Sequence, residues 1–322
     1  MSIVLIDCLA RGSGKRYATL DVIGAGPRFI IGVLKDLGLD VDLITCEDII
    51  VKPNRLEDYM ILMISAMSSD IKASHRILKL WNRYRRYKKG ISIIGGPISV
   101  EYEKLLRIGF DLVIYGEAEK TLEELVSIGV FERILDPKIL RSIKGIAFKE
   151  GSRIIFNGPR SWLRRSELSR YRADVRCITS YKFYWASRVY VEIVRGCSNF
   201  KRPKISLPDK PQCIECNICT SAPLDLRLNC PVGIPPGCGY CSVPMFFGPA
   251  RSRSEDMIYE EVKGLIDLGV NRIVLSAPDV LDYGRDLLVE PKPLTDPRTP
   301  PPNIEALESL FKRLWSIPEV SS

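Results

Sequence analysis

Seven cysteines gathered in one stretch are the residues of this sequence best suited to chemistry. The chain has ten cysteines, of which these seven fall between positions 197 and 241: Cys197, Cys213, Cys216, Cys219, Cys230, Cys238 and Cys241. Thiolates are soft ligands, and closely spaced thiols in a reducing compartment are typical of metal sites rather than of disulfides. The chain has a single histidine, His75, so a metal site here would be built almost wholly from sulfur.

The spacing divides these cysteines into three plus four. Cys197 follows an alternating stretch at 188–194 that predicts a strand, and Cys238 and Cys241 form a Cys-x-x-Cys pair with Tyr240 between them. The remaining four are Cys213, Cys216, Cys219 and Cys230, the first three at Cys-x2-Cys-x2-Cys spacing. Three protein ligands leave a metal site open to a further ligand, whereas four close it.

Two alternatives remain at this point. Cys230, Cys238 and Cys241 are themselves a compact triplet, which would leave Cys197 with the Cys-x2-Cys-x2-Cys group. Four cysteines at these spacings could also bind zinc in a ribbon-like site, although zinc would leave three thiols without a role. We favour Cys197, Cys238 and Cys241 as the open triplet because Cys197 directly follows a strand.

The first half of the chain alternates between short apolar strands and helix-length stretches. Strands are expected at 3–7, 41–44, 60–65, 91–94 and 111–115, and helices at 27–37, 70–88, 99–108 and 118–127. This order predicts an α/β fold with a doubly wound parallel sheet over residues 1–127. Ligands of such sheets bind at the carboxyl ends of the strands, where the loops carry Gly95, Gly96, Gly116 and Glu117.

The second half is expected to contain a connector and part of another α/β domain. Residues 128–187 form the connector, with a predicted hairpin from 145–148 and 154–157. Over 188–322, a strand, the cysteine-rich insertion at 198–237, a helix at 254–268, a strand at 272–276 and a helix at 303–315 predict the opening of a (βα) barrel. Arg251 and Arg253 lie before the first of these helices, as anion ligands or as part of its cap.

The strand followed by Arg195-Gly196-Cys197, with an aromatic residue inside the later Cys-x-x-Cys, resembles the radical SAM superfamily. The usual motif is Cys-x3-Cys-x2-Cys, whereas 40 residues separate Cys197 from Cys238 here. The resemblance implies a 4Fe–4S cluster on Cys197, Cys238 and Cys241, with an open iron that binds S-adenosylmethionine and with Tyr240 beside that cofactor. The insertion resembles half of a bacterial ferredoxin, which implies a second 4Fe–4S cluster on Cys213, Cys216 and Cys219, with Cys230 as a remote fourth ligand.

Residues 1–127 resemble the cobalamin-binding-type domain that precedes many radical SAM enzymes. The resemblance rests on Gly95-Gly96-Pro97 after one strand and Gly116-Glu117-Ala118-Glu119 after the next, and it implies that these loops contact a cofactor. The Asp-x-His-x-x-Gly motif that supplies histidine to cobalt is absent, and His75 lies within a predicted helix. Relatives keep this domain with or without the cofactor, so cobalamin is one of two alternatives.

The leading hypothesis is therefore a radical SAM enzyme that cleaves S-adenosylmethionine to a 5′-deoxyadenosyl radical. The resemblance implies hydrogen abstraction followed by methyl transfer, bond formation or rearrangement on a substrate that the sequence does not name, with ferredoxin or flavodoxin as the reducing partner. Alternatives are an iron–sulfur electron-transfer subunit and a tRNA methylthiotransferase, whose N-terminal domain carries three cysteines where this chain has Cys8 and Cys46. Because a complete barrel needs about six βα units, we expect a truncated chain or one completed by a partner.

Composition and charge exclude several other classes of protein. The net charge is +8, and 46% hydrophobic residues exclude a wholly disordered chain. No apolar run reaches the ~18 residues of a membrane span, and the first residues lack a signal-peptide pattern, so we expect a cytoplasmic protein. The basic and aromatic stretch at 70–88 is interpreted as an amphipathic helix with a solvated basic face, and nucleic acid is not an expected partner.

Overall fold

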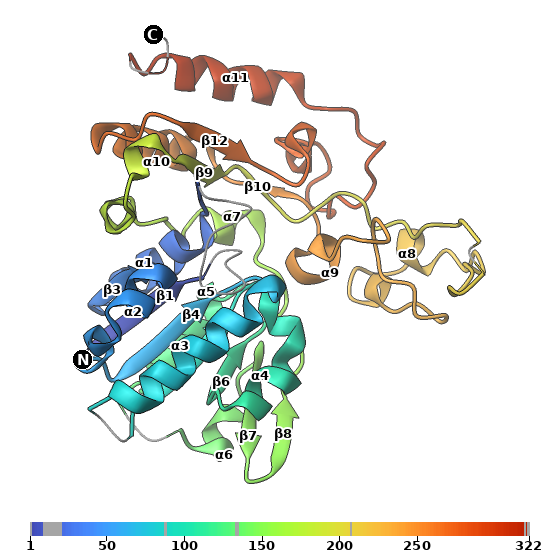
Figure 1. The fold of residues 1–322 in the computed structure, drawn as a ribbon. Coiled ribbons are helices and arrows are strands. Elements are labelled where there is room, and N and C mark those ends of the chain that lie inside the picture. The colour runs from blue at the N-terminus through green and yellow to red at the C-terminus, as the bar shows by residue number, and fades with distance from the viewer. Residues whose placement is uncertain are drawn as a thin grey trace. The chain divides into compact units, whose positions relative to one another are not determined.

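The computed structural model describes residues 2–8, 21–86, 89–132, 135–206, 208–318 and 320 (Figure 1). The chain divides into two compact units. The first comprises Met1–Ser161, Arg170–Tyr190 and Gly264–Val274, and the second comprises Trp162–Ser169, Val191–Lys263 and Leu275–Ser322.

A seven-stranded sheet of order β3-β1-β4-β5-β6-β7-β8 forms the centre of the first unit. Its strands are β1 (Ile3–Asp7), β3 (Val41–Thr45), β4 (Ile61–Ser65), β5 (Ile91–Gly95), β6 (Leu112–Ile114), β7 (Ile146–Glu150) and β8 (Arg153–Phe156). The first five in this order pair in parallel, with Ile3 opposite both Val41 and Ile61, and β7 and β8 extend the sheet in antiparallel pairing. The predicted hairpin is therefore confirmed, and it adds to the main sheet.

Helices cover this sheet because its central strands are apolar on both faces. The helices of the first unit are α1 (Gly26–Asp36), α2 (Cys46–Val51), α3 (Ile71–Tyr84), α4 (Tyr102–Ile108), α5 (Glu119–Ser127) and α6 (Pro137–Leu140). Val4 and Ile6 of β1 belong to one core cluster with Trp81 of α3 and Leu105 of α4. Ile3 and Leu5 alternate with them and are equally buried, as expected for a strand enclosed by helices on both sides.

The described elements agree closely with the predicted ones. All five strands predicted within residues 1–127 are present, and each predicted helix in that half overlaps an observed one. The helix predicted at 99–108 is divided, because a 3₁₀ turn at Pro97–Glu101 precedes α4. The short strand β2 (Val22–Ile23), which pairs in parallel with the later strand β9 (Arg188–Glu192), was not predicted because two residues carry no periodic signal.

The cysteine-rich half contains short elements joined by long irregular stretches. They are α7 (Arg165–Leu168), β10 (Val194–Arg195), α8 (Ile218–Ser221), α9 (Val243–Phe247), β11 (Arg251–Ser252), α10 (Glu255–Asp267), β12 (Ile273–Ser276) and α11 (Ile304–Trp315). A three-stranded sheet has the order β12-β9-β2, and β10 pairs antiparallel with β11. The predicted succession of strand, helix, strand and helix is confirmed, and the fold is α/β with a mostly parallel central sheet. Within the described residues, no helix is long and apolar enough to cross a membrane.

Candidate iron–sulfur sites

The glycine before Cys197 brings that cysteine against the chain that follows Cys241. Gly196 has φ +81°, and a Cβ added to it would lie 2.1 Å from the carbonyl oxygen of Pro249. Only glycine allows this approach. The Cys197 N–H donates to the Gly248 carbonyl oxygen at 3.0 Å. Because α9 connects Cys241 to this turn, the contact returns Cys238 and Cys241 to Cys197 across the 40-residue gap.

Asn199 contacts two of the three cysteines of the expected open triplet. Its backbone N–H donates to the Cys197 sulfur at 3.4 Å, and its side-chain nitrogen lies 3.6 Å from the Cys238 sulfur. Burial raises the pKa of the Cys197 thiol, and Asp282, Cys241 and Cys238 act in the same direction through their charges. The three thiols therefore lie within electrostatic range of one another. Asn199 was not predicted as a site residue, because only its position two residues after Cys197 indicates such a role in the sequence.

Asp282 supports the same loop from the other side. Its carboxylate accepts a hydrogen bond from the Ser198 N–H at 3.1 Å and forms an ion pair with Arg285 at 2.5 Å. Burial raises the pKa of Asp282, against the lowering effect of the Ser198 and Arg285 contacts. Asp282 follows β12 in the chain, so the loop after this strand supports the loop after Cys197.

Tyr240, expected beside a cofactor, is 94% exposed, and the neighbouring Cys238 is also exposed. Arg251 and Arg253, for which the sequence left anion binding and helix capping open, are both buried and bonded within the fold. Arg251 donates to the carbonyl oxygens of Pro249 (3.0 Å), Leu163 (2.6 Å) and Phe247. Arg253 pairs with Glu261 at 2.6 Å. Arg251 thus holds the turn that Gly196 contacts, and Arg253 joins Glu261 of α10 to the Glu192 carbonyl oxygen of β9.

The other four cysteines line a single cavity of about 550 Å³. Cys213, Cys216 and Cys219 lie on one wall segment and Cys230 on a second, eleven positions further along the chain. The other charged lining residues are Lys201, Arg202, Lys204, Glu215, Asp296 and Arg298. Cys197, Cys238 and Cys241 are not among the lining residues.

The cysteine side chains are not arranged around a single metal ion. Among the described residues, no three histidine, cysteine, aspartate or glutamate side chains are arranged to hold one metal ion. A 4Fe–4S cluster makes a different demand, because each thiolate binds its own iron at a separate corner of the cluster. The donor set, seven thiols with no histidine near them, fits iron–sulfur clusters.

The loops at the carboxyl ends of the parallel strands are tightly packed where sequence analysis had expected cofactor contacts. Gly96 has φ +90°, and a Cβ there would meet the Ala66 carbonyl oxygen at 2.8 Å. Gly95 lies against Ile114, Gly116 has φ +79°, and Glu117 is buried. The fold itself thus requires glycine at position 96.

The described residues of these loops do not fit a histidine-ligated cobalamin. His75 lies within α3, and the Asp7 carboxylate at the end of β1 accepts a hydrogen bond from the Tyr181 hydroxyl at 2.8 Å, with both residues buried. If this domain bound cobalamin, no histidine of the described residues would be available to bind its cobalt.

The three remaining cysteines lie in the first unit and are buried. Cys8 follows β1 and Cys46 begins α2; the hydrogen bond between their thiols, then burial, raises the pKa of Cys8. Burial raises the pKa of Cys177 to about 12, and its thiol donates to the Asp174 carbonyl oxygen. Thiols buried in apolar surroundings are inert, so none of the three extends the cysteine sites.

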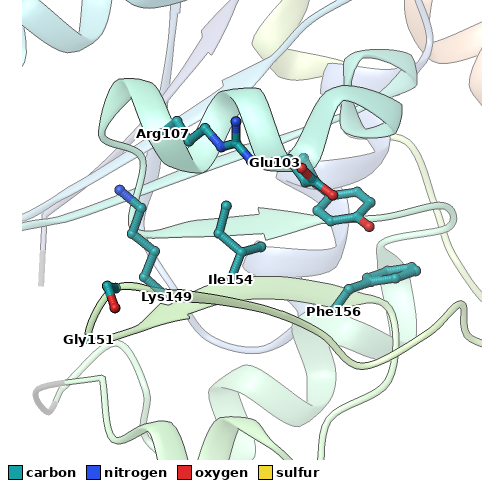
Figure 2. A pocket seen from close by; sticks show the side chains of 8 residues that line it. Glu103, Arg107, Lys149, Gly151, Ile154 and Phe156 are labelled. Atoms are coloured by element: carbon teal, nitrogen blue, oxygen red, sulfur yellow. Dashed lines mark hydrogen bonds and ion pairs between the residues drawn. The ribbon is translucent and has the colours of Figure 1, made fainter.

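A cavity of about 470 Å³ lies elsewhere in the first unit, between α4 and the β7–β8 hairpin. Figure 2 shows Glu103 and Arg107 on α4 opposite Lys149, Ile154 and Phe156 of the hairpin. Glu103 and Arg107 form an ion pair at 3.2 Å. None of the cysteines and none of the expected loop residues lines this cavity.

Comparison with known proteins relates both halves of the chain to characterised folds. The B12 binding domain family matches residues 16–126. The structure of TsrM, a radical S-adenosylmethionine methyltransferase from Kitasatospora setae, superposes on 89% of this chain and 48% of its own with a TM-score of 0.56 and 12% identity. The first half of the chain therefore contains a B12-binding-type domain, and the chain shares its fold with TsrM. Both likenesses agree with the resemblance to radical SAM proteins that carry a cobalamin-binding-type domain.

Curated relatives match nearly the whole chain. An uncharacterized protein of Methanopyrus kandleri is 43% identical over 97% of this chain and 55% of its own length. One of Methanocaldococcus jannaschii is 41% identical over 97% and 57%. The chain thus spans about half the length of these two relatives. The ribosomal protein uS12 methylthiotransferase RimO of Pseudothermotoga lettingae is 39% identical over 25% of this chain and 15% of its own.

Proposed function

We propose that this chain is the cofactor-binding part of a radical SAM enzyme, with its open 4Fe–4S cluster on Cys197, Cys238 and Cys241. The observation that carries the proposal is the contact of Asn199 with the sulfurs of both Cys197 and Cys238. Two cysteines separated by 40 residues meet at one asparagine, and Cys241 follows on the same loop. The fold shared with TsrM and the match to the B12 binding domain family support the choice of iron–sulfur over zinc.

When bound and reduced by one electron, the cluster would supply reductive cleavage of S-adenosylmethionine, the chemistry from which hydrogen abstraction at an unactivated carbon would start. The chain's own residues hold three corners of the cluster and leave the fourth open. The Asn199 N–H donates to the Cys197 sulfur, and such a bond stabilises negative charge on a thiolate. The ring of Tyr240 is free on the surface beside the triplet, where it would pack against the bound S-adenosylmethionine.

The reaction that follows hydrogen abstraction belongs to the whole protein. Methyl transfer is favoured by the fold shared with TsrM, and bond formation and rearrangement are the other candidates. The substrate is unassigned, and cobalamin is a candidate second cofactor of the B12-binding-type domain. A low-potential one-electron donor such as ferredoxin or flavodoxin would supply the electron, in the cytoplasm.

The test is anaerobic reconstitution with iron and sulfide, followed by electron paramagnetic resonance (EPR) of the reduced chain with and without S-adenosylmethionine. We expect a cluster signal that shifts when S-adenosylmethionine is added, formation of 5′-deoxyadenosine, and loss of both in Cys238→Ala. A signal that ignores S-adenosylmethionine would instead favour an iron–sulfur electron-transfer subunit. Zinc in protein isolated without oxygen would contradict both functions.

A methylthiotransferase is the second candidate, favoured by the similarity to RimO over a quarter of the chain. Against it, residues 1–127 contain only two cysteines, Cys8 and Cys46, and both are fully buried. Salt-dependent affinity of the chain for tRNA would support a methylthiotransferase that acts on tRNA. The absence of such affinity is the expected result.

A further inference from the structure

We infer that Cys213, Cys216, Cys219 and Cys230 bind a second 4Fe–4S cluster that is closed, with one thiolate on each iron. The four thiols line one cavity, and its volume of about 550 Å³ leaves ample room for a cube of four irons and four sulfides. The inference deepens the proposed function, on which it rests for the identity of the metal. It also decides between the two partitions of the cysteines.

The decisive residue is Cys230. In the alternative partition it would join Cys238 and Cys241, and Cys197 would join the Cys-x2-Cys-x2-Cys group. The structure instead puts Cys230 on the wall of the cavity that Cys213, Cys216 and Cys219 line. Cys197 is bound to the Gly248 carbonyl oxygen and to Asn199, outside that cavity.

The backbone between the first three cysteines contains two residues in the left-handed region, a feature of many anion-binding loops. Glu215 and Asn217, on either side of Cys216, have φ of +53° and +59°. A left-handed conformation at a residue other than glycine costs of order 1 kcal/mol and is retained where the surroundings require it. Alternation of left-handed and right-handed residues turns successive N–H groups toward one concave face, as in many iron–sulfur sites. One of these groups, the Glu215 N–H, already donates to the Cys213 sulfur at 3.4 Å.

The Arg202 side chain holds the segment that brings Cys230 to the cavity. Arg202 is buried, and its guanidinium donates to the carbonyl oxygens of Ile234 (2.7 Å), Arg227 (2.8 Å) and Leu228 (2.9 Å). These carbonyls flank Cys230 on both sides. Arg202 thus holds the backbone on both sides of Cys230, the cysteine that the sequence alone could not assign to either cluster.

The charges around the cavity suit a cluster with four thiolate ligands. Such a cluster carries a net negative charge, which grows when it is reduced. Four cations and two carboxylates line the cavity, and the carboxylates of Asp296 and Glu215 pair with Lys201 and Lys204. The positive excess offsets the charge of the bound cluster.

The test compares cysteine-to-serine variants of the reconstituted chain by iron and sulfide content and by EPR with and without S-adenosylmethionine. The wild-type chain is expected to hold about eight irons in two clusters. Cys216→Ser and Cys230→Ser should each remove about four irons and keep the signal that responds to S-adenosylmethionine. Cys197→Ser should abolish that response and leave the other cluster in place. Cys177→Ser, a buried cysteine of the first unit, is the matched control and should change neither.

The inference would be overturned in favour of the alternative partition if Cys230→Ser abolished the response to S-adenosylmethionine and Cys197→Ser removed the other cluster. A wild-type chain with about four irons that respond to S-adenosylmethionine would also overturn it, while the proposed function would stand. About four irons that ignore S-adenosylmethionine and are lost in Cys216→Ser and Cys230→Ser would uphold the closed site and sink the proposed function. Zinc in this cavity would overturn the inference.

Discussion

The carboxylate of Asp282 accepts a hydrogen bond from the backbone N–H of Ser198, the residue that follows Cys197. It joins the loop after β12 to the first cysteine of the triplet, and Arg285 completes a buried ion pair at 2.5 Å. The backbone next to Cys197 in the proposed open site is therefore held by a residue that lies 84 positions further along the chain than Ser198.

Asp282→Ala should lower the free energy of unfolding by about 3 kcal/mol, because it leaves the buried Arg285 guanidinium without its carboxylate. It should also weaken retention of the cluster that responds to S-adenosylmethionine, since Ser198 loses its acceptor. Urea unfolding and the iron content after gel filtration would measure these effects. Asp279→Asn is the matched control: Asp279 is exposed, and its contact is to the nearby Leu281 N–H. Equal stability of Asp282→Ala and the control would contradict the assigned role.

Gly196→Ala should abolish the open site. The added Cβ would lie 2.1 Å from the Pro249 carbonyl oxygen, and the φ of +81° is itself unfavourable for alanine. Cys197 must move, so we expect the response to S-adenosylmethionine to disappear with about four of the irons. Gly239→Ala serves as control, because the nearest atom to its Cβ is the Pro203 Cγ at 3.9 Å. A Gly196→Ala chain with the normal EPR response would refute the importance of this contact.

Much of this fold could be predicted because its signals are local. The apolar strands 3–7, 61–65 and 91–95 are buried on both faces, so their sequences read as continuous apolar runs. The amphipathic pattern of α3 likewise placed Ile77 and Trp81 in the core. Such patterns identify elements without knowledge of their partners.

The candidate sites were only partly predictable, because their supports are distant in sequence. Asn199 and Arg202 look like ordinary polar residues of an insertion, and their roles depend on contacts with Cys238 and with carbonyl oxygens near Cys230. The roles of Arg251 and Arg253 stayed open for the same reason. A basic residue before a helix is compatible with an anion site or with a cap, whereas in the structure both guanidinium groups contact internal carbonyl or carboxylate oxygens.

Arg202→Lys should selectively destabilise the four-cysteine cavity. A lysine ammonium cannot reach the three carbonyl oxygens that the planar guanidinium spans, and each hydrogen bond of a charged group contributes about 1.5–3 kcal/mol. We expect loss of about four irons and an unchanged response to S-adenosylmethionine. Lys210→Arg is a control within the same insertion, at an exposed residue outside the cavity lining. Loss of the S-adenosylmethionine response in Arg202→Lys would contradict the independence of the two sites.

Asp174 should make the stability of the first unit depend on pH. Burial acts to raise its pKa, but hydrogen bonds from Lys35 at 2.8 Å and from the Cys177 N–H at 2.7 Å outweigh burial and lower it. A lowered folded-state pKa adds stability above the ordinary aspartate value of about 3.9, and that stability is lost as the pH falls through the folded-state value. Asp174→Asn should therefore cost about 1 kcal/mol at pH 7 and progressively less below pH 4. Urea titrations of both proteins between pH 7 and pH 3 would measure the difference, and a constant difference would contradict the assignment.

The ten cysteines should separate into two reactivity classes in the cluster-free chain. Cys216 and Cys238 are exposed, whereas Cys8 and Cys177 are buried and have raised pKa values. Because the thiolate is the nucleophile, a pKa of about 12 leaves Cys177 almost wholly protonated at pH 8. Iodoacetamide should therefore modify Cys216 and Cys238 in the native chain, and Cys8 and Cys177 only after unfolding in urea, as read by peptide mass spectrometry. Labelling of Cys8 in the native chain at the rate of Cys216 would show that the first unit opens readily. In the reconstituted chain, protection of Cys216 and Cys238 as well would report that both clusters are bound.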